Sequence, residues 1–152
     1  MSASRKIRRS SNKNTLGNSE HGSGVVADIT SESALRTALE NEETPLVIDF
    51  WAPWCAPCRA MAPGFEAAAT ELAGKVRFAK INTESNPQLA GRFNISSIPA
   101  LIVFDRGEVA DSSVGLRSKA QIKAMLQRVL DKRAGIGPID KLQRLFGKRS
   151  AA

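Results

Sequence analysis

The feature that most constrains this chain is a pair of cysteines, Cys55 and Cys58, placed where a strand gives way to a helix. Residues 46–51 form a short apolar run interrupted only by Asp49, which predicts a strand buried on both faces. After the cysteines, apolar residues recur at helical spacing and predict one buried stripe, at Met61, Phe65, Ala68, Ala69 and Leu72. The cysteine pair is therefore expected at a strand-to-helix junction.

That position has chemical consequences for the two sulfurs. Unpaired N–H groups and the helix dipole favour negative charge at a helix N-terminus, so we expect Cys55, at the first position, to have a lowered pKa and to be the attacking thiolate. Cys58 lies one turn further on, close enough to close a small-loop disulfide, and Pro57 suits the first helical turn because its missing N–H costs little there. The pattern indicates dithiol–disulfide exchange.

A metal site is the main alternative for the two cysteines. A structural zinc site needs four ligands, commonly two such cysteine pairs. The chain offers two thiols and a single histidine, His21, far away in the N-terminal tail. A site shared between subunits stays open, but the residues favour redox chemistry and no metal is expected. Two cysteines at redox spacing also suit a reducing compartment.

The net charge of +7 is concentrated at the two ends of the 152-residue chain. Residues 1–24 carry +4 and residues 132–152 carry +5, which leaves −2 for the part between them. We predict a disordered basic tail at 1–24, one domain at 25–133, and a basic extension at 134–152 with a brief amphipathic pattern. That extension is expected to dock on the domain, to contact an anionic surface or a partner, or to fray.

The N-terminus lacks the apolar centre of a secretory signal, and no apolar run approaches the roughly 20 residues that span a bilayer. We therefore expect a cytoplasmic protein, although an Arg- and Ser-rich start is also compatible with an organelle transit peptide. Strands expected at 25–29, 46–51, 76–82, 101–104 and 109–114 alternate with helices beginning near residues 31, 55, 87 and 118. Residues 105–108 are expected to form a hairpin turn, and Ser118 with Gln121 a capping box at the start of the last helix. This order predicts an α/β fold, with a mixed sheet and helices on both faces.

The segment from Ile48 to Cys55, together with Arg59 and Met61-Ala62-Pro63, resembles the active-site region of thioredoxins, most closely the bacterial thioredoxin-2 type. The resemblance covers roughly residues 25–130 and implies the thioredoxin fold. Thioredoxin-2 proteins usually begin with a zinc-binding module made of two cysteine pairs. No cysteine precedes Cys55, so that module is absent from this sequence.

Asp49 and Lys80 gain a role from the resemblance. Within an apolar strand, the pKa of the Asp49 carboxyl should rise through desolvation, and by itself the group fits a paired core carboxylate equally well. The resemblance instead implies a proton acceptor for Cys58, acting directly or through water. Lys80, which alone would read as a surface strand residue, matches the lysine near that acid.

The substrate-binding surface also follows from the resemblance. By spacing alone, Pro99 would be a trans proline at a strand start. The resemblance implies a cis Ile98–Pro99 bond, with the Ile98 backbone available to pair with an extended substrate. Trp54 and Gly115 are expected to line the docking surface beside Ala56 and Pro57. In the same way, Gly107 is expected to serve a turn, Trp51 to pack beneath the site, and Pro63 to kink the helix.

The resemblance implies a protein disulfide reductase that needs no bound cofactor and is regenerated from NADPH by a thioredoxin reductase. It also implies disulfide-containing substrate proteins and a monomeric state. Two alternatives remain: a disulfide oxidant or isomerase, and a binding protein tethered through its basic tails. Ala56 stands where thioredoxins usually have glycine, so the reduction potential is expected to differ, in a direction that the sequence leaves open.

Overall fold

The computed structural model describes residues 25–136 of the chain. The predicted tail at 1–24, His21 within it, and the predicted extension from residue 137 onward lie outside the described residues. The predicted domain at 25–133 falls within them.

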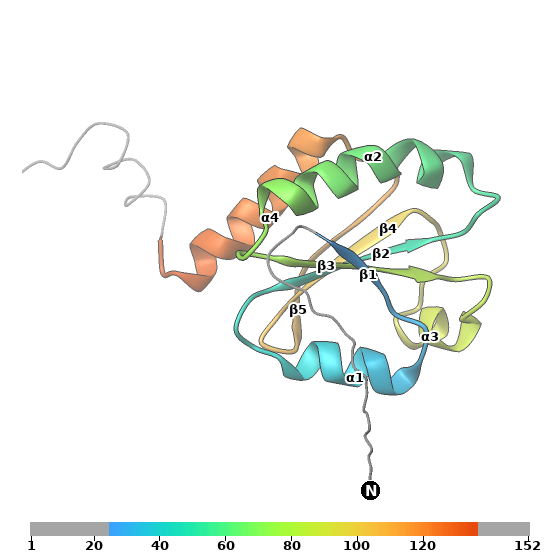
Figure 1. Cartoon of the computed structure of the whole chain (residues 1–152), viewed down its shortest axis with the longest axis horizontal. Helices are drawn as coiled ribbons and strands as arrows, with labels where there is room; N and C mark the ends of the chain where they lie inside the picture. Colours follow the sequence, from blue (N-terminus) through green and yellow to red (C-terminus); the bar gives the residue numbers. More distant parts are fainter. Residues whose placement is uncertain (1–24, 137–152) are drawn as a thin grey trace, which may run out of the picture.

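One sheet forms the centre of the described part (Figure 1). Its strands are β1 (Val26–Asp28), β2 (Leu46–Trp51), β3 (Arg77–Asn82), β4 (Ala100–Asp105) and β5 (Glu108–Val114). They lie in the order β1-β3-β2-β4-β5, with β1 and β2 parallel to β3. β4 runs antiparallel to β2, and β5 antiparallel to β4. The mixed sheet predicted from the element order is confirmed.

Helices cover both faces of the sheet (Figure 1). They are α1 (Glu32–Glu40), α2 (Ala56–Glu71), α3 (Pro87–Arg92) and α4 (Lys119–Arg133). Helices α2 and α4 lie side by side on one face, and α1 and α3 lie on the other. Helix α4 begins with the predicted capping box: the Gln121 N–H donates to the Ser118 hydroxyl, and the Ser118 N–H donates to the Gln121 side chain. The predicted fold class is therefore confirmed.

Each face of the sheet has its own core, because successive strand residues point to opposite sides. On β2, Val47 packs with Met61 and Phe65 of α2. Its neighbours Ile48 and Phe50 pack on the opposite side, beneath α1 and α3. β2 is buried on both faces as predicted, so its C-terminal end gives the cysteine pair a rigid base.

Some boundaries differ from the prediction by one residue. Cys55 is the N-cap of α2, just before the first helical residue where the sequence placed it. Strand β1 spans Val26–Asp28, one residue shorter at each end than the predicted 25–29. These differences leave the architecture unchanged.

Candidate active site

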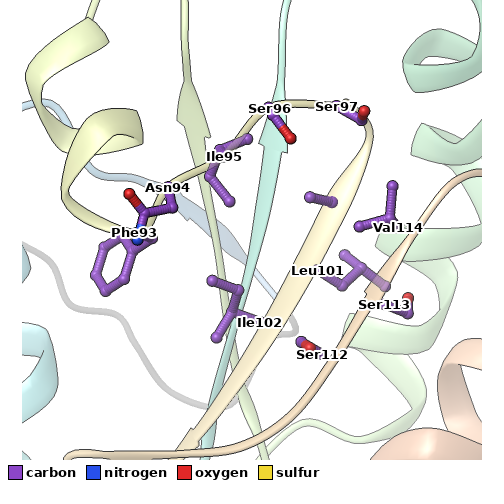
Figure 2. Close-up of a pocket in the computed structure, with 11 residues that line it drawn as sticks. Phe93, Asn94, Ile95, Ser96, Ser97, Leu101, Ile102, Ser112, Ser113 and Val114 are labelled. Carbon is purple, nitrogen blue, oxygen red and sulfur yellow. The ribbon is translucent and has the colours of Figure 1, made fainter.

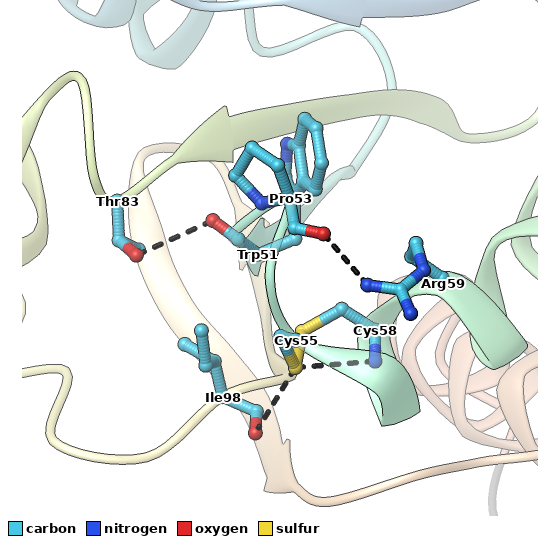
Figure 3. The surroundings of a disulfide bond; sticks show 7 residues. All are labelled: Trp51, Pro53, Cys55, Cys58, Arg59, Thr83 and Ile98. Carbon is cyan, nitrogen blue, oxygen red and sulfur yellow. Dashed lines mark hydrogen bonds between the residues drawn. A yellow bond between two sulfur atoms is a disulfide. The ribbon is translucent and has the colours of Figure 1, made fainter.

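The two cysteines lie at the N-terminus of α2 and form a disulfide, with their Cα atoms 5.2 Å apart (Figure 3). Cys55 is the N-cap, and its Sγ accepts a hydrogen bond from the Cys58 backbone N–H at 3.2 Å. Cys58 lies in the first turn, after Ala56 and Pro57, whose side chains are exposed. The N–H group expected to stabilise charge on the Cys55 sulfur is therefore in place.

The disulfide is recessed into the protein. Cys55 is 4% exposed and Cys58 2%, and both pack against Ala52, Trp51 and Ile98. The Ile98 carbonyl oxygen lies 3.9 Å from the Cys55 Sγ (Figure 3). In the disulfide that sulfur carries no hydrogen, so this is a polar contact; only a reduced thiol could donate to the carbonyl. The contact brings the loop before β4 against the Cys55 sulfur.

Backbone contacts hold the segment between β2 and α2. The Cys55 N–H donates to the Ala52 carbonyl at 3.1 Å. Across the sheet end, both the N–H and the hydroxyl of Thr83 donate to the Trp51 carbonyl, at 2.8 and 3.3 Å (Figure 3). From inside α2, the Arg59 Nη1 reaches back to the Pro53 carbonyl at 2.7 Å (Figure 3). These bonds hold residues 51–53, the segment that leads from β2 to Cys55.

The loop facing the disulfide contains a cis Ile98–Pro99 bond, as the resemblance implied and against the expectation from spacing alone. The Gly115 N–H donates to the Pro99 carbonyl at 2.8 Å, at a positive φ of 100° that favours glycine. Trp54, which directly precedes Cys55, is 67% exposed. The predicted docking residues thus lie on segments that meet around Cys55.

A hollow of about 200 Å³ is formed by the same loop together with β4 and β5 (Figure 2). Its lining combines the apolar side chains of Ile95, Ile102 and Val114 with the hydroxyls of Ser96 and Ser112. Its lining includes Ser97, which directly precedes Ile98 in the loop that contacts Cys55.

Asp49 is buried in β2, with 4% of its surface exposed, and burial raises the pKa of its carboxyl from 3.8 to about 7, although Lys80 opposes the rise. Asp49 and Val47 are two residues apart on β2 and therefore share the sheet face that α2 covers. Lys80 is the direct register partner of Asp49 on β3. Within residues 25–136, no hydrogen bond joins the Asp49 carboxyl to either cysteine.

The described geometry matches the thioredoxin family, whose profile covers residues 26–128 of this chain. The chain belongs to the thioredoxin family. It is 37% identical over 106 residues to thioredoxin 1 of Nostoc sp., across 70% of this chain and 98% of that one. It is 39% identical over 106 residues to thioredoxin C-2 of Corynebacterium nephridii, across 70% of this chain and 97% of that one.

A crystal structure of chloroplastic thioredoxin z is also similar, with a TM-score of 0.63 and 31% identity over 68% of this chain and 93% of that one. The family and the cysteine pair establish thiol–disulfide exchange as the activity of this thioredoxin. These comparisons do not distinguish the thioredoxin-2 type from other thioredoxins.

Two contacts of this thioredoxin were not predicted. Sequence reasoning placed Trp51 beneath the site as packing, but its ring also faces the Lys80 ammonium, 5.1 Å from the ring centroid. Arg59 was noted only as part of the family segment, and its bond to the Pro53 carbonyl spans six residues. Both contacts depend on the path of the chain in three dimensions, and no spacing rule indicates them.

Within residues 25–136, no group of three or more His, Cys, Asp or Glu side chains is placed to hold a metal ion. None of the helices in that part of the thioredoxin is long and apolar enough to cross a membrane.

Proposed function

We propose that this thioredoxin is a protein disulfide reductase in which Cys55 attacks and Cys58 resolves. The observation that carries the proposal is the N-cap position of Cys55, whose sulfur accepts the Cys58 N–H at 3.2 Å. When the disulfide is reduced, this N–H and the helix dipole favour a thiolate at Cys55. Cys58 lies within the turn and is the more deeply buried of the two.

The reaction has two exchange steps. The Cys55 thiolate attacks one sulfur of a substrate disulfide, a mixed disulfide forms, and the first substrate thiolate leaves. The Cys58 thiolate then attacks the Cys55 sulfur, which forms the Cys55–Cys58 disulfide and releases the second substrate thiolate. Two electrons pass from the dithiol to the substrate, and the substrate thiolates take up protons.

Asp49 is proposed as the proton acceptor for Cys58 in the second step, directly or through water. A buried carboxyl whose pKa is about 7 exists in both protonation states near neutral pH, so it can take up a proton there and release it again. Asp49 also shares the sheet face that α2 covers. Lys80, its register partner, would set how readily it ionises.

A substrate would bind as an extended segment across the surface formed by Trp54, Ala56, Pro57, Ile98–Pro99 and Gly115. The Ile98 carbonyl already lies beside the Cys55 sulfur and is available for strand-like pairing. The neighbouring hollow has room for a side chain of the same segment (Figure 2). Its mixed lining fits a residue with an apolar body and a polar tip.

We further propose that the oxidised protein is regenerated from NADPH by a thioredoxin reductase, and that it acts as a monomer in the cytoplasm. Bacterial relatives support that compartment, whereas the relative from Pisum sativum is a chloroplastic thioredoxin, 37% identical over 102 residues. That match covers 67% of this chain and 59% of the relative.

The test is insulin disulfide reduction by the full-length protein, combined with its reduction potential. Reductase activity that is lost in Cys55→Ser, together with a reduction potential of about −270 mV for the wild-type protein, would support the proposal. A potential between about −180 and −120 mV would favour the oxidant or isomerase instead.

A tethered binding protein would give a different result. Its binding to an anionic partner would weaken with salt and disappear when the basic ends, residues 1–24 and 134–152, are removed. Insulin reduction that survives the same trimming would favour the reductase.

A further inference from the structure

Three side chains on one face of the sheet form a set that the proposed mechanism only partly uses. Asp49 and Trp51 are two residues apart on β2, so both point toward the face that α2 and α4 cover. Lys80 follows Phe78 by two residues on β3, and Phe78 belongs to the core on that face. Lys80 is also the direct register partner of Asp49. A lysine and an aspartate in this relation would ordinarily pair.

The lysine instead faces the indole. Lys80 Nζ lies 5.1 Å from the centroid of the Trp51 ring, within the range of a cation–π interaction. The ion pairs formed among residues 25–136 do not include one between Lys80 and Asp49. Within the described part of the chain, the Asp49 Oδ1 is buried and has no hydrogen-bond partner. The ammonium therefore acts on the carboxyl only from a distance.

We propose that Trp51 is a positioning residue: its indole face holds the Lys80 ammonium and so keeps the neighbouring Asp49 carboxyl without a cation partner. Tryptophan is the aromatic side chain that binds a cation most strongly through its face, and partial desolvation strengthens the interaction. Trp51 is half-buried beside the disulfide, which limits competition by water for the ammonium.

The other groups around Asp49 leave Lys80 as the cation that matters. β4 contributes Leu101 opposite Asp49, which has no charge. The first turn of α2, on the same face of the sheet, holds Cys58, which does not titrate in the disulfide. On the far side of Lys80, β1 contributes Asp28, the register partner of Lys80 and exposed to solvent. Lys80 thus has a carboxyl group on each side, Asp28 on β1 and Asp49 on β2. The contact with the Trp51 indole determines how closely the ammonium approaches either one.

The consequence for catalysis rests on the proposed role of Asp49 as a proton acceptor. The restraint of the Lys80 ammonium by the Trp51 indole does not depend on that role. A buried carboxyl without a cation partner ionises near neutral pH, where it can exchange a proton with Cys58. The same carboxyl paired with Lys80 would stay ionised to lower pH and would be a weaker base. By this inference, Trp51 sets the pH range in which the resolving step is fast.

The experiment is a carboxyl-carbon NMR titration of Asp49 in the oxidised full-length protein, where neither cysteine titrates. In Trp51→Leu we expect Lys80 to move onto Asp49 and to lower its pKa by about half to one pH unit. Trp51→Phe keeps a weaker aromatic face and removes a buried indole N–H that has no partner, so it should fold and give a smaller decrease.

The matched control is the same pair of substitutions in a Lys80→Met background. Without the ammonium, replacing Trp51 should leave the Asp49 pKa unchanged. An equal decrease in that background would mean that removing Trp51 merely hydrates the carboxyl, and would overturn the inference. An unchanged or raised pKa in both Trp51→Leu and Trp51→Phe, with Lys80 present, would also overturn it.

Turnover separates this inference from the proposed function. If Asp49→Asn reduces insulin at the wild-type rate at every pH, the proton-acceptor role fails. The NMR result would still decide whether Trp51 restrains Lys80.

Discussion

Two acidic side chains close together in the sequence, Cys55 and Asp49, lie in opposite environments. Cys55 caps α2, and its sulfur accepts a backbone N–H at 3.2 Å. Asp49, six residues earlier, is buried within β2 with one carboxyl oxygen that has no partner. The first site favours a negative charge and the second opposes it.

The difference suggests how one small site handles both a nucleophile and a base. The thiolate must be available before the substrate arrives, so the helix N-terminus that supports it is built into the backbone. In the proposed mechanism, Asp49 must first take up a proton and later release it, which requires a carboxylate whose charge is not strongly stabilised. A carboxylate held in an ion pair would remain ionised and could not take up the proton.

Substitution of either cysteine should have the largest effect on the exchange reaction. Cys55→Ser should lower insulin reduction by about 10³-fold or more, because a serine hydroxyl is not ionised at neutral pH and cannot form the mixed disulfide. Cys58→Ser should instead accumulate the mixed disulfide with substrate, detectable by mass spectrometry under non-reducing conditions. Trapping in Cys55→Ser but not in Cys58→Ser would reverse the assigned roles.

Asp49→Asn should have the largest effect on stability. Burial raises the carboxyl pKa from 3.8 to about 7, so between those pH values the unfolded chain releases a proton that the folded chain keeps. Folding stability contributed by this group is therefore complete below about pH 4 and is lost as pH rises to about 7. At 1.36 kcal/mol per pH unit, removing the charge should raise the unfolding free energy at pH 8 by up to about 4 kcal/mol.

The measurement is urea denaturation of the oxidised protein at pH 5 and pH 8. Glu84→Gln, an exposed substitution with the same change in charge, is the matched control and should have little effect. Equal stabilisation by Asp49→Asn at both pH values would show that burial does not oppose the carboxylate.

Arg59 supports the Cys55 side of the comparison. Its Nη1 donates to the Pro53 carbonyl, which restrains the loop before Cys55. Arg59→Met keeps most of the stem and should cost about 1 kcal/mol in unfolding free energy and slow the attack on insulin. Arg59→Lys is the control, because it keeps the positive charge but not the planar guanidinium geometry. An unaltered rate of insulin reduction in Arg59→Met would show that the contact with the Pro53 carbonyl is dispensable.

Ala56→Gly should have the smallest effect. Ala56 is the first residue of α2, and glycine loses more backbone entropy on folding than alanine does. We expect a decrease of about 0.5 to 1 kcal/mol in the unfolding free energy of the oxidised protein. An increase would mean that the alanine methyl strains the turn between the cysteines.

The parts of this structure that depend on local rules could be predicted from the sequence. The capping box of Ser118 and Gln121, the turn at 105–108 and the two-sided burial of β2 were all predicted correctly. Each of these features needs only a few neighbouring residues or a strand period. The cis Ile98–Pro99 bond did not follow from local rules and was expected only through the family resemblance.

The contacts that tune the site could not be predicted in this way. The Lys80–Trp51 contact depends on the register between β2 and β3, and a shift of one residue would turn Lys80 to the other face. The Arg59–Pro53 bond depends on the path of a loop that folds back over the first turn of α2. Such contacts are decided by tertiary packing rather than by composition or spacing.

The most direct test of the account is to find which cysteine reacts first. The reduced full-length protein would be treated at pH 7 with less than one equivalent of iodoacetamide, and the labelled cysteine identified by peptide mass spectrometry. We predict that the label lies on Cys55, because the thiolate at the helix N-terminus is the reactive species. Preferential labelling of Cys58, or equal labelling of both, would contradict it.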